Sequence, residues 1–156
     1  MIKILFVCLG NICRSPLAEG LFKQKLAAAG QTAFFKVDSA GTSDYHIGEL
    51  PDERTRANAK ENGLILSHRG RQFSSDDFRH FDHIIVMDES NKERVLSQVR
   101  SAEDTEKVVL MRAYEQQEAL KFTDVPDPYH GGADGFQRVY DILDRTTEAL
   151  LQKLLR

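Results

Sequence analysis

The segment from Met1 to Cys8 constrains the fold more than any other feature of the chain. It is a continuous apolar run interrupted only by Lys3. A strand with one face in water alternates polar and apolar residues, whereas a strand of a parallel sheet is covered on both faces and is apolar throughout. The segment therefore predicts a central strand of a parallel sheet.

Helical patterns and short apolar runs alternate along the rest of the chain. From Ser15, which can cap a helix with Pro16 in its first turn, the pattern is helical up to Gly30. Strand-like runs and helical stretches then alternate, the former at 33–37, 83–87 and 107–111, the latter at 52–62, 91–99 and 136–155. This alternation favours an α/β protein with a parallel sheet. No repeat or Pro/Gly/Ser-rich linker divides residues 1–156, so one domain is expected.

Composition excludes several classes of partner and site. The chain holds 21 Lys and Arg against 24 Asp and Glu, and its net charge of −3 gives no general attraction to nucleic acid or anionic membranes. The longest apolar run, Ile4 to Leu9, is much shorter than the ~20 residues of a membrane span. The chain has only two cysteines. They exclude a disulfide framework and a four-cysteine zinc site, and they favour a reducing cytoplasm as the location.

Two groups of charged side chains are interpreted as ordinary surface. His80 and His83 with Asp82 lack a convergent further ligand, so no metal is expected there. The mildly basic side chains between positions 69 and 80 are expected to be solvated: Arg69, Arg71, Arg79 and His80.

The loop from Cys8 to Pro16 carries the strongest functional signal. It follows the carboxyl end of the predicted first strand, where parallel α/β sheets place their ligands. Inward-facing backbone N–H groups and the positive end of the next helix can together bind a tetrahedral anion. These donors and Arg14 stabilise Cys8 as a nucleophilic thiolate, and Arg14 can hold two phosphate oxygens at once. Because a bare Cys-x5-Arg pattern is common by chance, the strand, Gly10 and Ser15 around it decide the interpretation.

The sequence VCLGNICRSP of this loop resembles the signature loop of the low-molecular-weight protein tyrosine phosphatases. Further matches follow in the family's order and at similar spacing: DSAGTS at 38–43, SHR at 67–69, MDESN at 87–91 and DPY at 127–129. The resemblance implies a three-layer, flavodoxin-like α/β fold with a four-stranded parallel sheet flanked by helices. It also implies hydrolysis of phosphotyrosine through a cysteinyl-phosphate, without metal or other cofactor.

Asp127 is the candidate general acid for the departing phenolate. Pro126 and Pro128 flank it and restrict where its carboxyl group can point. Once ionised, Asp127 would act as the base for the water that frees Cys8, and an acid-side pH optimum is expected. Asp124 is the local rival, and a plain Pro/Gly turn is the alternative reading of this segment.

Supporting residues are assigned by the resemblance. It implies that Asn11, Ser39 and His68 form a hydrogen-bond network that holds the loop, and that Ser15 donates to Cys8 as it leaves as a thiolate. Each side chain has suitable donors, although ordinary turn or capping chemistry stays an equal alternative for Ser39. Asp88, at the end of the third strand, is expected to be structural and to help orient this network.

The resemblance also assigns the rim of the pocket. Leu9, Ile12, Tyr45 and Tyr129 match positions whose apolar and aromatic walls would hold a phenyl ring. Relatives that resemble arginine phosphatases carry threonine in place of Ile12, so tyrosine is the expected substrate. A surface aromatic in a mobile loop is the alternative for Tyr45. His130 stands where many relatives carry a second tyrosine. This difference argues against regulation by phosphorylation of a pair of tyrosines.

Cys13 lies in the same loop and has two open interpretations. It can capture an oxidised Cys8 as a disulfide, which would make oxidation reversible, or it can be a small buried loop residue. The complete phosphate-binding loop is therefore expected to comprise Leu9, Gly10, Asn11, Ile12, Cys13 and Ser15 beside Cys8 and Arg14.

Two other functions compete with phosphatase activity. Arsenate reductases of the same fold pass oxidation to downstream cysteines, but no cysteine follows Cys13 in this chain. The only arsenate reductase still compatible with the sequence is one that uses an external thiol. A non-catalytic phosphate-binding module is the second alternative, and Asp127 argues against it because nucleophile, clamp and acid are all present. The expected partners are a phosphotyrosine protein and inhibitory anions such as phosphate and vanadate, with no nucleic acid or membrane. A monomer is the expected state.

Overall fold

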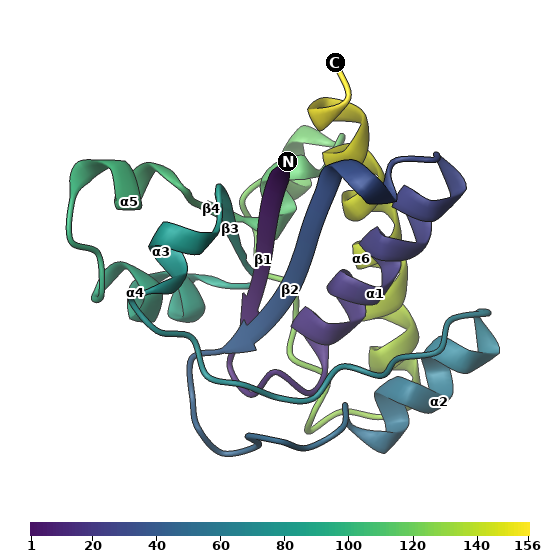
Figure 1. The fold of residues 1–156 in the computed structure, drawn as a ribbon. Helices are drawn as coiled ribbons and strands as arrows, with labels where there is room; N and C mark the ends of the chain where they lie inside the picture. Colours follow the sequence, from purple (N-terminus) through teal and green to yellow (C-terminus); the bar gives the residue numbers. More distant parts are fainter.

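A four-stranded parallel sheet forms the centre of the molecule in the computed structural model, which describes all residues from 1 to 156 (Figure 1). Its strands are β1 (Ile2–Cys8), β2 (Phe35–Gly41), β3 (His83–Val86) and β4 (Val108–Leu110). Their order in the sheet is β2-β1-β3-β4, and each neighbouring pair is parallel. The α/β fold with a four-stranded parallel sheet is thereby confirmed.

Helices cover both faces of this sheet and complete three layers (Figure 1). One side carries α1 (Arg14–Ala28), α2 (Glu53–Glu61) and α6 (Ala133–Leu154); the other carries α3 (Asp77–His80), α4 (Glu89–Leu96) and α5 (Ala102–Glu106). Three short 3-10 turns are η1 (Thr32–Phe34), η2 (Met111–Tyr114) and η3 (Glu118–Leu120). None of the helices has the length and apolar character that a membrane span requires.

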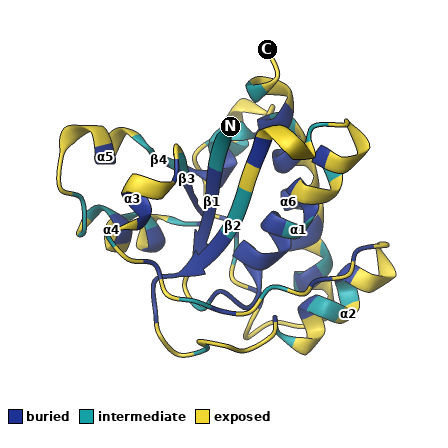
Figure 2. Cartoon of the chain, viewed as in Figure 1, coloured by how far each residue is buried: buried dark blue, intermediate teal, exposed yellow.

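Strand β1 is buried on both faces, as its apolar run predicts (Figure 2). Ile4 and Phe6 belong to the apolar cluster shared with α1 and α6. Leu5 and Val7 belong to the cluster on the opposite face of the sheet. This two-sided packing fixes β1 at the centre and places its carboxyl end, with Cys8, between two layers of helices.

Several predicted boundaries differ from the structure. The strand expected at 33–37 instead spans Phe35–Gly41 and pairs with the whole length of β1. Its second half contains Asp38 and Ser39, polar residues that sequence patterns do not assign to a buried strand. The helix expected from position 91 begins at Glu89, because the Asp88 side chain caps it by accepting a hydrogen bond from the Asn91 N–H at 2.7 Å.

Candidate active site

The predicted loop encloses a cavity of about 340 Å³ at the carboxyl end of the sheet. The walls come from the loop after β1, from residues 45–46 and from residues 127–130. Its lining residues are Cys8, Leu9, Gly10, Ile12, Cys13, Arg14, Tyr45, His46, Asp127, Tyr129 and His130. One cavity is therefore lined by the candidate nucleophile Cys8, the anion clamp Arg14 and the acid Asp127. Asp127 is far from the other two residues in the sequence.

The backbone of the loop is arranged to bind an anion. The carbonyl oxygens of Cys8, Leu9 and Ile12 accept hydrogen bonds from the N–H groups of Thr42, Ser43 and Asp52 at 2.8–2.9 Å. By contrast, the N–H groups of residues 10–13 have no hydrogen-bond partner in the protein. Such a row of unpaired N–H groups next to a helix N-terminus is a site for a tetrahedral anion.

Gly41 allows the loop to lie against strand β2. A Cβ atom at this position would be 2.8 Å from the Leu9 carbonyl oxygen and 3.0 Å from the Asn11 nitrogen, both of which are backbone atoms. Backbone atoms cannot move aside as a flexible side chain can. Glycine is therefore required here for the observed shape of the loop.

The prediction that Ser15 caps the helix is wrong. Helix α1 begins at Arg14, and Cys13 at the capping position makes no side-chain capping bond. The buried Ser15 hydroxyl instead accepts a hydrogen bond from Asn11 Nδ2 at 2.7 Å and lies 3.0 Å from Cys8 Sγ. No side chain therefore caps the first N–H groups of α1, and these groups are available to a ligand.

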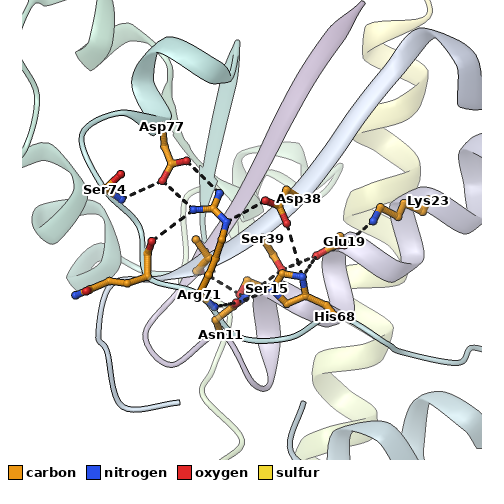
Figure 3. Close-up of polar contacts among 12 residues, drawn as sticks. Asn11, Ser15, Glu19, Lys23, Asp38, Ser39, His68, Arg71, Ser74 and Asp77 are labelled. Atoms are coloured by element: carbon orange, nitrogen blue, oxygen red, sulfur yellow. Dashed lines mark hydrogen bonds and ion pairs between the residues drawn. The ribbon is translucent and has the colours of Figure 1, made fainter. Parts of the chain in front are cut away.

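Asn11 is the centre of the network that supports the loop (Figure 3). Its Nδ2 donates to Ser15 Oγ and to Ser39 Oγ at 3.0 Å. Its Oδ1 accepts from the Arg71 N–H at 3.0 Å and lies 2.7 Å from His68 Nε2. The structure therefore brings together the predicted residues Asn11, Ser39 and His68. Asn11 itself has a left-handed backbone, with φ at 57°.

Two further charged residues complete this network, and no sequence pattern assigned them to it. The buried Glu19 accepts from Ser39 Oγ at 2.6 Å and lies 3.1 Å from His68 Nδ1 (Figure 3). The expectation that Arg71 is solvated is wrong, because it pairs with Asp38 at 2.9 Å and with Asp77 at 3.0 Å. The one signal for Glu19 was its spacing of one helical turn from Ser15.

Replacing Asn11 by alanine is expected to destabilise the protein by about 2–4 kcal/mol, because buried partners lose their bonds and alanine disfavours a positive φ. Asn11→Gly should lose the same bonds but recover about 1 kcal/mol, since glycine tolerates this backbone. Urea unfolding of both variants measures the difference. Equal stabilities for wild type and Asn11→Ala would show that the network does not hold the loop.

Arg14 is buried between the loop and the segment before Asp127. Its Nη1 donates to Asp88 Oδ2 at 2.7 Å and to the Val125 carbonyl oxygen at 2.9 Å. Burial lowers the pKa of Arg14, but Cys8 and Asp88 outweigh it and hold the pKa above its ordinary value. Asp88 was expected to help orient the Asn11 network. In the structure it is instead a partner of Arg14.

Asp127 lies at the mouth of the cavity, with its side chain 40% exposed. Its Oδ1 accepts a hydrogen bond from the Tyr129 N–H at 3.0 Å, and its Oδ2 is 3.6 Å from Arg14 Nη2. The rival Asp124 does not line the cavity, and its Oδ1 accepts from the Glu89 N–H at the start of α4. The geometry therefore favours Asp127 over Asp124 as the acid.

Comparison with known proteins identifies the family. The family described as low molecular weight phosphotyrosine protein phosphatase matches residues 3–156. The chain belongs to this family. As a member it is a phosphoric monoester hydrolase, and the resemblance carried by its loop is confirmed.

Relatives of this phosphatase family match it over almost the whole length. The low molecular weight phosphotyrosine protein phosphatase of Schizosaccharomyces pombe is 44% identical over 89% of this chain and 88% of its own length. The human protein of the same name is 40% identical over 97% of this chain and 94% of its own. A crystal structure of an Entamoeba histolytica protein tyrosine phosphatase has a TM-score of 0.92 and 41% identity, covering 99% of this chain and 97% of that one.

The predicted rim residues surround the cavity to different degrees. Tyr45 is 74% exposed and Tyr129 is 39% exposed, so their rings are available to a ligand. Leu9 is exposed, whereas Ile12 is mostly buried and packs with Cys13 and Phe136. His46, which no sequence pattern singled out, also lines the cavity, with its Nδ1 2.7 Å from Glu49 Oε2.

Cys13 is a free, buried thiol, and this burial raises its pKa to about 12. Because the thiolate is the reactive form, we expect iodoacetamide at about pH 8.5 to modify Cys8 and to leave Cys13 intact in the native chain. Phosphate should protect Cys8. Mass spectrometry of peptides tests this, with urea-unfolded protein as the control in which both thiols react. Native modification of Cys13 at the unfolded rate would contradict it.

Proposed function

We propose that the chain hydrolyses phosphotyrosine in proteins, and small aryl phosphates, through a phosphate ester of Cys8. Arg14 clamps the phosphate, and Asp127 acts first as general acid and then as general base. The observation that carries this proposal is the convergence of Cys8, Arg14 and Asp127 on one cavity at the N-terminus of α1. These three side chains supply a nucleophile, an anion clamp and a proton donor.

In the first step Cys8 Sγ attacks phosphorus. The S–P bond forms as the bond from phosphorus to the aryl oxygen breaks, and the electron pair of that bond goes to the oxygen. Asp127 gives its proton to this oxygen, so the product leaves as a neutral phenol. The N–H groups of residues 10–13 and Arg14 stabilise the charge on the transferring phosphoryl group.

In the second step water attacks phosphorus of the cysteinyl-phosphate. The new O–P bond forms, Asp127 takes the water proton, and the S–P bond breaks. Cys8 leaves as a thiolate, to which the Ser15 hydroxyl, 3.0 Å from Sγ, donates a hydrogen bond. Since the first step needs protonated Asp127 together with ionised Cys8, the highest activity is expected on the acid side of neutrality.

The remaining site residues hold the loop or contact the substrate. Asn11, Ser39 and His68 keep the loop in shape, while Leu9 and Gly10 continue its backbone around the phosphate. The rings of Tyr45 and Tyr129 contact the two faces of the substrate's phenyl ring. Ile12 offers this ring an apolar contact and has no group to bond a guanidinium, which favours phosphotyrosine over phosphoarginine.

The proposal is tested with a panel of substrates in the presence of EDTA. A phosphotyrosine peptide should be hydrolysed, with phosphate and vanadate as competitive inhibitors, and phosphoarginine and phosphoserine should react much more slowly. Faster hydrolysis of phosphoarginine would overturn the substrate class. Reduction of arsenate with glutathione and no ester hydrolysis would favour the reductase, and phosphate binding without turnover would favour a binding module.

A further inference from the structure

We propose that Arg54, in the first turn of α2, is a positioning residue for Asp127 and acts by stacking against Tyr129. The inference rests on the proposed role of Asp127 as general acid. Arg54 does not line the cavity, so it does not contact the substrate or the reacting atoms. It acts on residues 126–132, here called the acid loop. This loop contains Asp127 and connects Val125, which contacts Arg14, to the start of α6.

The acid loop has few contacts that fix it to the rest of the protein. Just before it, Val125 is well held, with its N–H bonded to the Met87 carbonyl and its own carbonyl bonded to Arg14. From 126 to 132, however, hydrogen bonds stay within the loop or reach the first turn of α6, as in the bond from the Gly131 N–H to the Pro128 carbonyl at 2.9 Å. Besides the ion pair between Asp127 and Arg14 at 3.6 Å, the ring of Tyr129 attaches the acid loop to the rest of the protein through its contacts with Arg54 and His46.

The guanidinium of Arg54 lies between two aromatic rings. Its central carbon is 5.3 Å from the centroid of Tyr129 and 4.8 Å from the centroid of Phe136. Both distances are within the range of attractive cation–π contacts. Arg54 therefore joins the acid loop to the beginning of α6, which carries Phe136.

The other contacts of Arg54 lead to the phosphate-binding loop. Its Nε and Nη2 donate to the two carboxylate oxygens of Asp52, both at 3.1 Å, which fixes the plane of the guanidinium. The Asp52 N–H in turn donates to the Ile12 carbonyl oxygen at 2.8 Å. Phe136 packs against Ile12 and Cys13. Arg54 thus holds the acid loop in a fixed place relative to the loop that binds phosphate.

The connection from Tyr129 to the acid is direct. The Tyr129 N–H donates to Asp127 Oδ1 at 3.0 Å, so a shift of Tyr129 moves a donor that orients the carboxyl group. Such a displacement matters, because proton transfer in the transition state requires a well-aligned acid. Lysine has no planar fork and would not reproduce both the stacking and the paired bonds to Asp52.

The test compares two esters that differ in their need for an acid. Phenyl phosphate has a poor leaving group and needs protonation, whereas 2,4-dinitrophenyl phosphate has a good one and does not. For Arg54→Gln and Arg54→Lys we expect kcat/KM to fall about 5- to 20-fold on phenyl phosphate and about twofold or less on the dinitrophenyl ester. A role in stability alone would lower both values equally.

A double-mutant cycle with Asp127→Asn completes the test. If Arg54 acts through Asp127, Arg54→Gln should cause no further selective loss on phenyl phosphate in the Asp127→Asn background. Arg79→Gln, which alters an exposed arginine paired with Asp76, is the matched control and should leave both rates unchanged. Thermal unfolding confirms that the variants are folded.

Three results would overturn the inference: equal losses on the two esters, no loss for either Arg54 variant, or full additivity with Asp127→Asn. The failure of the proposed function looks different. In that case Asp127→Asn itself would lack any preference between the esters, or the wild-type chain would hydrolyse neither of them.

Discussion

Replacing Cys8 by serine is expected to lower kcat for aryl phosphate hydrolysis by about 10⁴-fold or more, while phosphate still binds. A serine hydroxyl is not ionised at neutral pH, and Asp127 is protonated in the first step, where it acts as the acid, so it does not serve as a base for the hydroxyl. The N–H groups of residues 10–13 and the Arg14 guanidinium stay in place, so the anion site survives.

Calorimetric titration with phosphate, together with turnover of phenyl phosphate, measures both parts of this prediction. Cys13→Ser removes the other thiol of the loop and is expected to lower kcat by much less than tenfold. Substantial turnover by Cys8→Ser would contradict the nucleophile assignment. Loss of phosphate binding together with activity would instead show that the substitution disturbed the loop.

Replacing Asp127 by asparagine is expected to lower kcat/KM for phenyl phosphate by about 10²- to 10³-fold, the usual contribution of a general acid. Asparagine keeps the size and the acceptor of the side chain but has no proton to give. The decline of kcat/KM with rising pH, which reports loss of the acid's proton, should disappear in this variant.

Asp124→Asn is the matched control for this prediction, because Asp124 precedes Asp127 by three residues but lies outside the cavity. It should retain wild-type kcat/KM and the same pH profile. An effect of Asp124→Asn as large as that of Asp127→Asn, or an unchanged profile in the latter, would reassign the acid.

The central features of the fold were predictable from the sequence because they depend on local patterns. The apolar run of β1 shows that it is covered on both faces, and the loop from Cys8 to Arg14 is continuous in the chain. For the same reason the candidate nucleophile and clamp can be recognised from the sequence alone. Asp127 needed the resemblance, since a carboxylate between two prolines is otherwise an ordinary turn.

The residues that sequence patterns did not reveal act through contacts between distant parts of the chain. Arg54 is far from Tyr129 and Phe136 in the sequence, and the pairing of Arg71 with Asp38 and Asp77 follows from the course of the chain after β2. A sequence pattern shows an arginine but does not show what lies beside it.

The role of Ser15 differs from its helix-capping prediction for another physical reason. Serine before proline is a common helix start, and the local preference is genuine. In this protein, however, the hydroxyl is buried next to Cys8 and Asn11, and tertiary contacts outweigh the preference for a cap. The same competition extends β2 to Gly41, where Asp38 and Ser39 are satisfied by the network around the loop.

Trapping the phosphorylated intermediate on Cys8 tests the proposed mechanism most directly. Asp127→Asn, in which water is no longer activated, is mixed with 2,4-dinitrophenyl phosphate and quenched in acid, and its peptides are examined by mass spectrometry. We predict phosphate on the peptide that contains Cys8, at a level that decays once the substrate is consumed. Turnover without any phosphorylated Cys8, or phosphate on another residue, would show that Cys8 is not the nucleophile.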